Sequence, residues 1–242
     1  MENLLLYKSP FPKERIGKNN DGGYVITNLP GDYDMFLSGG ISNDISFEND
    51  LIVKYPYLTC YAFDGSIEKL PQNNNNIIFV KKNIGCLNNE FLTNLHEYME
   101  SYNNIFMKLD IEGFEFRVLP TFFENNYIYK VKQLVVEIHS PADIILYPEY
   151  FVGLSDIKNE NMFELFKNLN KTHTLIHFHA NNGCNMNIID GINIPHVFEL
   201  TYIRNDFITE KIQNDKSLPT EFDMKNKIEN PDYTLYGFPY SI

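Results

Sequence analysis

Short hydrophobic runs alternate with amphipathic stretches along most of the chain. Apolar runs that are rich in aromatic and β-branched residues predict strands at 35–38, 57–64, 76–80, 105–110, 132–139, 172–179 and 196–203. Apolar positions at helical spacing predict helices at 43–54, 88–102, 115–123 and 161–169. Pro120 is expected to kink or shorten the third of these helices.

This order of elements indicates an α/β protein with a Rossmann-like, doubly wound, seven-stranded sheet. The segment 181–195 has no helical pattern, so the sheet is expected to be mostly parallel with an antiparallel last strand. We expect a single domain over residues 1–242. Residues 1–30 would cover it from the N-terminal side, and residues 205–242 would form a tail that wraps the surface.

Charge and composition narrow the choice of partners. The 242 residues include 20 Lys and Arg against 32 Asp and Glu, a net charge of −12. A general nucleic-acid binder needs a basic stripe to neutralise phosphates, so no nucleic-acid partner is expected. No run approaches the ~20 apolar residues of a membrane span, and the N-terminus lacks a secretory pattern, which predicts a cytoplasmic protein. Three cysteines without a CxxC pair predict neither a disulfide framework nor a zinc ribbon.

Residues that follow the first three strands are candidates for a nucleoside site, because ligands of open α/β sheets lie beyond the carboxyl ends of the strands. Gly39 and Gly40 let the backbone approach a ligand closely. Asp64 is placed to accept hydrogen bonds from both ribose hydroxyls, and Ser66 and Ile84 follow nearby. A simple turn and a helix-capping acid are the structural alternatives for these residues.

The details of this pattern disfavour a pyrophosphate. The chain lacks a GxGxxG sequence, and the predicted helix after the glycines starts with Asp44 and Glu48. A cofactor with a ribose and no phosphate therefore fits better than a dinucleotide.

Acidic residues gather where the fourth and fifth strands end. Asp110 and Glu112 alternate onto one side of the chain, and so do Glu137 and His139. Asp110, Glu137 and His139 could hold Mg²⁺ or Mn²⁺, or His139 could act as a general base that Glu137 orients. Alternatively, Glu112 and Glu137 pair with nearby Lys or Arg side chains. Glu115 is interpreted as an acid that compensates the dipole at the start of a helix.

Five segments carry a resemblance to a known family: RIGKNNDGGYVI (15–26), LSGGISNDISFEND (37–50), YAFDGS (61–66), FMKLDIEGFEFRVL (106–119) and LVVEIH (134–139). Through them the chain resembles the class I S-adenosylmethionine (SAM)-dependent methyltransferases of the FkbM-like group. The resemblance implies SAM as the cofactor. It also implies O-methylation of a sugar or glycan hydroxyl, or of another small hydroxylated acceptor.

The resemblance assigns roles in SAM binding to Gly39, Gly40, Asp64, Ser66, Ile84, Asp110 and Arg15. Asp64 would grip the ribose, with Ser66 and Ile84 beside the adenine, while Gly39 and Gly40 would line the methionine part. The chain departs from many class I enzymes because Leu37 and Ser38, rather than an acid, precede the two glycines.

The remaining assignments concern the reacting end of the cofactor and the acceptor. Asp110 would lie under the sulfonium, and Arg15 could pair with the SAM carboxylate or with an acid of the substrate. The catalytic candidates are His139, Asp110 and Glu137, and the substrate candidates are His179, Asn181, Asn182 and Glu112.

Two other classes of protein stay open at this point. A nicotinamide- or nucleotide-sugar-dependent Rossmann enzyme would use the same strand ends, although the pyrophosphate loop is missing. A non-catalytic binding module could also be built on a methyltransferase scaffold.

Overall fold

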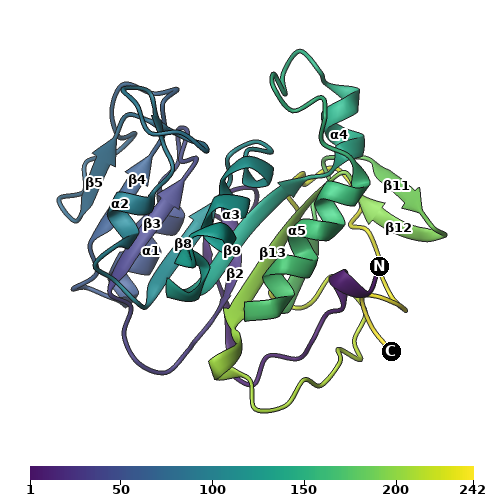
Figure 1. Cartoon of the computed structure of the whole chain (residues 1–242). Coiled ribbons are helices and arrows are strands. Elements are labelled where there is room, and N and C mark those ends of the chain that lie inside the picture. The colour runs from purple at the N-terminus through teal and green to yellow at the C-terminus, as the bar shows by residue number, and fades with distance from the viewer.

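A computed structural model describes all residues from 1 to 242 and contains one seven-stranded sheet (Figure 1). In spatial order its strands are β10 (His173–Ala180), β13 (Val197–Arg204), β9 (Val131–His139), β8 (Ile105–Leu109), β3 (Met35–Gly39), β4 (Cys60–Phe63) and β5 (Ile77–Val80). β13 lies between β9 and β10 and runs antiparallel to both, whereas every other neighbouring pair is parallel. The predicted fold class is therefore confirmed, including the antiparallel last strand.

Both faces of the sheet are covered, as expected for strands that are buried on both sides. The helices are α1 (Ser46–Lys54), α2 (His96–Met99), α3 (Glu115–Glu124), α4 (Pro141–Leu146) and α5 (Asn159–Thr172), with short 3₁₀ turns at Glu2–Leu4, Tyr127–Lys130 and Asn205–Phe207. Helices α3 and α5 pack on one face over a core of 38 buried residues (Figure 1). Helix α1 and a hairpin pack on the other face over a core of 16. No helix has the length and apolar character needed to cross a membrane.

The covering hairpin consists of β1 (Lys13–Gly17) and β2 (Gly23–Thr27), with the DGGY segment at its turn. These two strands were not predicted from the sequence. Residues of the C-terminal tail run beside the N-terminal segment, where the Lys8 N–H donates to the Ile212 carbonyl and the Asn214 N–H donates to the Leu6 carbonyl. The Asn20 side chain in the turn of the hairpin also donates to the Lys225 carbonyl of the tail.

The prediction of a helix at 88–102 is wrong. This segment holds only the four-residue α2 and the strand β7 (Leu92–Thr93), which pairs with β6 (Asn83–Ile84). The side chain of Asn89 accepts the N–H groups of Phe91 and Leu92, and the side chain of Asn94 accepts the N–H of His96. Asparagine side chains that bond locally to the backbone compete with helix formation, which explains the error.

Other boundaries shift for equally local reasons. Helix α1 begins at Ser46 rather than at residue 43, because the Asp44 side chain accepts both the N–H and the hydroxyl of Ser46. Helix α3 continues past Pro120 to Glu124, so the proline does not shorten it. The expected loop at 181–195 contains a second hairpin, β11 (Met186–Ile189) and β12 (Ile192–Pro195), and α4 was not predicted.

Candidate functional site

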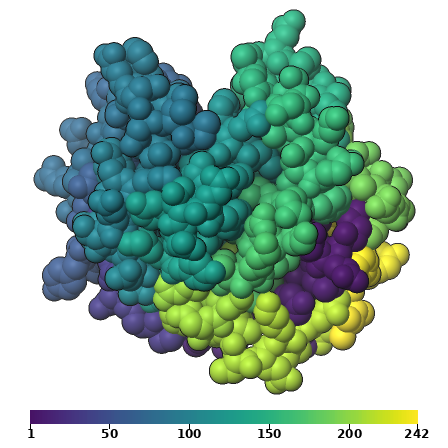
Figure 2. All heavy atoms as spheres, viewed as in Figure 1, coloured from purple at the N-terminus to yellow at the C-terminus, as the bar shows by residue number.

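Two adjoining cavities open where β3, β4 and β8 end. The larger has a volume of about 390 Å³, the smaller about 240 Å³, and both are lined by Gly40, Ser42, Asp110 and Glu112. They lie where the strand order reverses beside β3, which is the usual ligand position in such sheets. Asn83 lines one side of the larger cavity and Tyr150 another. Figure 2 shows a notch between the blue and green parts of the chain that carry these residues.

Gly40 sits at the junction of the two cavities and cannot be replaced without strain. Its φ is +74°, and a Cβ at this position would lie 1.6 Å from the carbonyl oxygen of Asp110. The ends of β3 and β8 therefore meet only because residue 40 has no side chain. Gly39 serves the same close packing against Ile84, but it lines neither cavity.

Asp64 ties together two of the loops around the larger cavity. Its carboxylate accepts the N–H of Ser42 at 2.7 Å, and the N–H and hydroxyl of Ser66 at 2.8 and 2.5 Å. Ser66 and Ile84 line the same cavity. The structure therefore brings the residues expected at a nucleoside end together, and it gives Asp64 a structural task as well.

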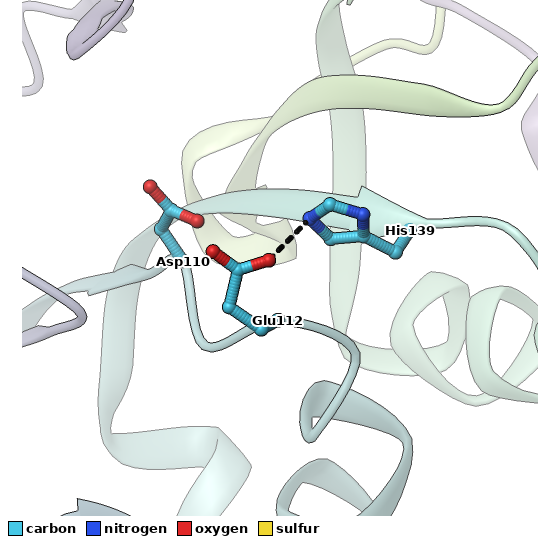
Figure 3. A group of neighbouring side chains, drawn as sticks. All are labelled: Asp110, Glu112 and His139. Carbon is cyan, nitrogen blue, oxygen red and sulfur yellow. Dashed lines mark ion pairs between the residues drawn. The ribbon is translucent and has the colours of Figure 1, made fainter. Parts of the chain in front are cut away.

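The acids of the FMKLDIEG segment and His139 form a compact group (Figure 3). The Nε2 atom of His139 lies 3.0 Å from Glu112 and 3.6 Å from Glu137, and its Nδ1 atom is 2.8 Å from Asp143. The residue that orients the imidazole is therefore Asp143 rather than Glu137. Asp143 follows His139 by four residues where β9 turns into α4, which is too weak a signal to single it out from sequence.

Glu112 reaches the cavity through an unusual backbone conformation. Its φ is +56°, in the left-handed region that non-glycine residues rarely adopt, and Gly113 follows with a φ of +84°. The Glu112 side chain is half exposed, whereas that of His139 is only 12% exposed. The acid that faces a ligand is consequently Glu112, and His139 stands behind it.

His139 and the acids around it shift one another's pKa values. Burial alone would lower the pKa of His139, but Asp143, Glu112 and Glu137 outweigh it and raise that pKa well above its ordinary value. Burial would raise the pKa of Glu112, but His139 lowers it below its ordinary value. At neutral pH an imidazolium therefore faces an ionised Glu112.

The two other predicted catalytic acids are deeply buried. Burial, with Asp110 close by, raises the pKa of Glu137 to about 8. Burial also raises the pKa of Asp110, whose carboxylate accepts a hydrogen bond from the Tyr24 hydroxyl at 2.8 Å. Both line the smaller cavity, and Asp110 lines the larger one as well.

A divalent cation would find a slightly different set of donors from the predicted one. One donor atom each from Asp110, Glu112 and His139 lies within 4.8 Å of the others, so Glu112 takes the place that was expected for Glu137. Two oxygens and one nitrogen are compatible with Mg²⁺ or Mn²⁺. The protonated imidazole, however, already balances the carboxylate charge.

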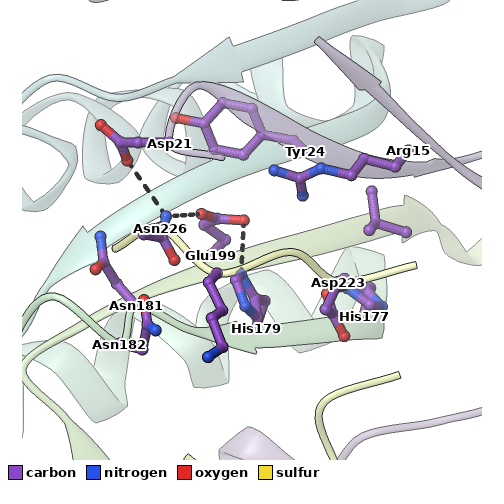
Figure 4. A network of polar contacts seen from close by, with 12 residues as sticks. Arg15, Asp21, Tyr24, His177, His179, Asn181, Asn182, Glu199, Asp223 and Asn226 are labelled. Atoms are coloured by element: carbon purple, nitrogen blue, oxygen red, sulfur yellow. Dashed lines mark hydrogen bonds and ion pairs between the residues drawn. The ribbon is translucent and has the colours of Figure 1, made fainter. Parts of the chain in front are cut away.

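Several residues predicted for the site lie elsewhere. Arg15 lines neither cavity, and it bonds to carbonyl groups of its own hairpin. The Nδ1 atom of His179 lies 3.2 Å from Glu199 inside a buried network (Figure 4). Asn181 closes a local turn, and Asn182 bonds to the backbone of Lys227. The structure therefore places none of His179, Asn181 and Asn182 at the two cavities.

Tyr150 is a site residue that the sequence reasoning missed. It lies in the loop after α4 and lines the larger cavity. Burial and the neighbouring Glu112 carboxylate raise the pKa of the phenol to about 12. A tyrosine in a loop of irregular course carries no sequence pattern that would have revealed it.

No protein-family model and no curated protein matches the sequence. Among solved structures, the chain is similar to a fibrillarin/Nop5p complex at 11% identity, covering 73% of this chain and 74% of that one, with a TM-score of 0.41. It is similar to a Methanococcus jannaschii fibrillarin pre-rRNA processing protein at 14% identity, covering 79% and 82%, with a TM-score of 0.39.

A third similar structure is a mutant 16S rRNA (adenine(1408)-N(1))-methyltransferase with cosubstrate SAM from Catenulisporales acidiphilia. The identity is 8%, the coverage 79% of this chain and 96% of that one, and the TM-score 0.35. At these values the likeness concerns the fold and not the reaction. The FkbM-like relationship is not confirmed and stays a prediction.

One expectation about partners is contradicted. The sequence predicted a small-molecule or glycan acceptor and no nucleic acid, yet the similar structures are a fibrillarin in complex with Nop5p and a 16S rRNA methyltransferase. The exclusion of nucleic acid is therefore withdrawn. Its physical basis was the net charge of −12, which is an average over the surface and leaves local binding sites open.

Proposed function

We propose that the protein is a SAM-dependent methyltransferase that acts on a hydroxyl group. The observation that carries this proposal is the pair of joined cavities at the switch point, with Asp64 in the larger one and with Asp110 and Glu112 at the junction. A nucleoside fits beside Asp64, and a sulfonium cation is stabilised by the carboxylates at the junction. SAM meets both requirements, whereas a dinucleotide would also bring an anionic pyrophosphate beside these carboxylates.

When bound, SAM would supply an electrophilic methyl group on a cationic sulfur. The residues of the chain would then hold the acceptor oxygen in line with that methyl group and take up its proton. Glu112 suits the second task because its side chain faces the cavity and is ionised. As the new C–O bond forms, the acceptor oxygen becomes strongly acidic, so even a weakly basic carboxylate can accept the proton.

His139 and Asp143 support Glu112 in this mechanism. The imidazolium lies 3.0 Å from the Glu112 carboxylate and fixes its position, and the 2.8 Å contact to Asp143 fixes the ring. This differs from a mechanism in which His139 itself is the base, because a histidine with a strongly raised pKa holds its proton at neutral pH.

Calorimetry tests the cofactor part of the proposal. SAM and S-adenosylhomocysteine are expected to bind the full chain, whereas NADH and UDP-glucose are not. Failure of both sulfur compounds to bind would refute a methyltransferase, and binding of either control would favour the other Rossmann enzymes.

The acceptor is tested separately. A sugar hydroxyl is the group that the family resemblance implies, and both glycans and the ribose of RNA carry it. Incubation with [methyl-³H]SAM and either glycan or RNA extracts would show which source is labelled. If SAM binds and neither extract nor any small hydroxylated compound is labelled, the chain is a binding module.

Metal dependence is tested in the same assay. If Glu112 is the base, labelling persists after dialysis against EDTA. Loss of labelling in EDTA and its return with Mg²⁺ or Mn²⁺ would instead assign a cation to Asp110, Glu112 and His139.

A further inference from the structure

The smaller cavity lies between the turn of the β1–β2 hairpin and the loop that follows β3. Lys18 and Asp21 belong to its hairpin side, and Asn43 and Asp44 to its loop side. It continues from the larger cavity across Gly40 and Ser42. If the nucleoside lies beside Asp64, the smaller cavity is the space left for the other end of SAM, which carries an ammonium and a carboxylate.

Only two cations line this cavity, and one of them is already engaged. Lys108 is 5% exposed, its ammonium donates to the Gly40 carbonyl at 2.8 Å, and it lies 3.8 Å from the carboxylate of Glu48. It also lies over the ring of Tyr24, 5.5 Å from the centroid. Releasing Lys108 would leave a buried Glu48 without its cation, so it cannot turn toward a ligand at low cost.

Lys18 is the cation that can turn. Its side chain is 52% exposed, and its contact is a single ion pair of 3.1 Å with Asp44. Asp44 still accepts hydrogen bonds from the N–H and the hydroxyl of Ser46 when Lys18 moves away. Because Lys18 is half exposed and Asp44 retains its other hydrogen bonds, exchanging Asp44 for a ligand carboxylate costs little stability.

Arg15, the cation that the sequence favoured for this role, is directed elsewhere. Its guanidinium donates to the carbonyls of Lys18 and Asn20, which lie within the same hairpin. In Figure 4 it points toward the group that contains Glu199, His179 and Asn226. Arg15 therefore shapes the turn that carries Lys18 rather than reaching the ligand.

The C-terminal tail holds that turn in place. The Asn20 side chain donates to the Lys225 carbonyl at 3.1 Å. The Asn226 side chain donates to Asp21 at 3.2 Å and to Glu199 on β13 at 2.8 Å (Figure 4). Lys18 thus stands on a turn that is tied to the sheet, which limits the entropy lost when it binds a ligand.

From these contacts we infer that Lys18 binds the carboxylate of the methionine end of SAM. The inference rests on the proposed function, because it takes SAM as the ligand. The acids of the same cavity, Asp21 and Asp44 among them, would face the ammonium of that end. The cavity therefore offers one mobile cation and several anions to a zwitterion.

Two ligands that differ only in the methionine end test the inference. S-adenosylhomocysteine carries the amino-acid end, and 5′-methylthioadenosine lacks it. In calorimetry on the full chain, Lys18→Met is expected to raise the Kd of S-adenosylhomocysteine about tenfold, the loss of one charge-assisted pair, and to change the Kd of 5′-methylthioadenosine less than about twofold. Lys18→Arg is expected to retain most of the affinity.

Lys54→Met is the matched control, because Lys54 pairs with Glu14 of the same hairpin at 2.7 Å but lines neither cavity. It should leave both affinities unchanged. An equal effect of Lys18→Met on the two ligands, or no effect on either, would overturn the inference and leave the proposed function standing. If the wild-type chain binds neither ligand, the proposed function fails and the inference falls with it.

Discussion

At Glu112 a carboxylate is held over the cavity by a backbone conformation that costs free energy. A left-handed non-glycine residue is typically disfavoured by about 1–2 kcal/mol, and it persists only where the surrounding structure enforces it. Here the turn between β8 and α3 enforces it, with Gly113 next in the chain and Glu115 bonded back to the Ile111 N–H at 2.7 Å. Glu112 thus faces the cavity, whereas Glu115 supports the turn that holds it there.

A Glu112→Gln variant tests whether Glu112 accepts the proton of the acceptor. It keeps the size of the side chain and removes its ability to accept a proton. We expect methyl transfer to fall by about 10²–10⁴-fold, with the Kd of S-adenosylhomocysteine unchanged within about twofold. Labelling assays and calorimetry measure the two quantities, and equal activity of variant and wild type would exclude Glu112 as the base.

Glu115 predicts a pH dependence of stability. Burial raises its pKa from 4.5 to about 7 in the folded chain. The folded state therefore binds this proton more tightly than the unfolded state. The associated stability is complete below pH 4.5 and is lost as the pH rises through 7, by about 3 kcal/mol in all.

The Glu115→Gln variant keeps an acceptor for the Ile111 N–H and cannot ionise. Its Tm relative to wild type is therefore expected to rise between pH 5 and pH 8.5. Glu137, whose pKa is about 8, acts in the same direction in both proteins and cancels in the difference. A difference in Tm that does not vary with pH would contradict the assignment.

Site residues at strand ends can be predicted from sequence, whereas those in irregular loops cannot. Asp64, Asp110 and Glu112 directly follow strands, and strand ends can be located from apolar runs. Asp143 and Tyr150 come from α4 and the loop after it, whose paths are set by tertiary contacts. No apolar periodicity encodes such contacts, so these residues emerged only from the structure.

Among the elements, the loop after β3 depends most on a single position. Gly40→Ala would place a Cβ 1.6 Å from the Asp110 carbonyl at a φ of +74°. We expect it to lower the free energy of unfolding by at least about 3 kcal/mol, since backbone must move as well as adopt strain. Urea denaturation would measure the loss.

Gly153→Ala provides the matched control. Gly153 has a φ of +84°, but a Cβ there would have no atom within 4 Å. Only the strain of about 1–2 kcal/mol is then expected. If both variants lose the same stability, the close approach at Gly40 is not what requires glycine.

The strands of this protein are easier to predict from sequence than its helices. The central strands β3 and β8 are nearly continuous apolar runs because both of their faces are buried. The segment 88–102 has helical spacing of apolar residues, but its asparagines bond to nearby N–H groups and divide it into turns. Periodicity cannot detect such competition.

For the whole molecule, the contacts that anchor the C-terminal tail to the loop after β10 matter most. Asn182 donates to the carbonyls of Lys227 and Asn230 and accepts the Lys227 N–H. Asn182→Ala is expected to destabilise the fold by about 1–3 kcal/mol and to speed proteolysis within 205–242. Asn73→Ala, in an exposed loop, should do neither. Unchanged proteolysis of the Asn182 variant would argue against this anchor.

The expectation that residues 1–242 form a single domain remains a prediction.

The net charge of −12 has a direct consequence for the stability of the whole chain. Self-repulsion of a compact anionic protein is screened by salt, so Tm is expected to rise between 10 and 150 mM NaCl. A falling Tm over this range would show that attractive ion pairs dominate instead.

The fastening of the hairpin by the tail also sets an order of events during synthesis. Asn20 and Asp21 leave the ribosome early, but their partners Lys225 and Asn226 follow 205 residues later. At typical rates of about 5–20 residues per second, the turn over the smaller cavity waits about 10–40 s for its anchors. A chain that ends before residue 225 would therefore contain every strand of the sheet but not the anchors of the hairpin turn, so the cavity is finished among the last parts of the molecule.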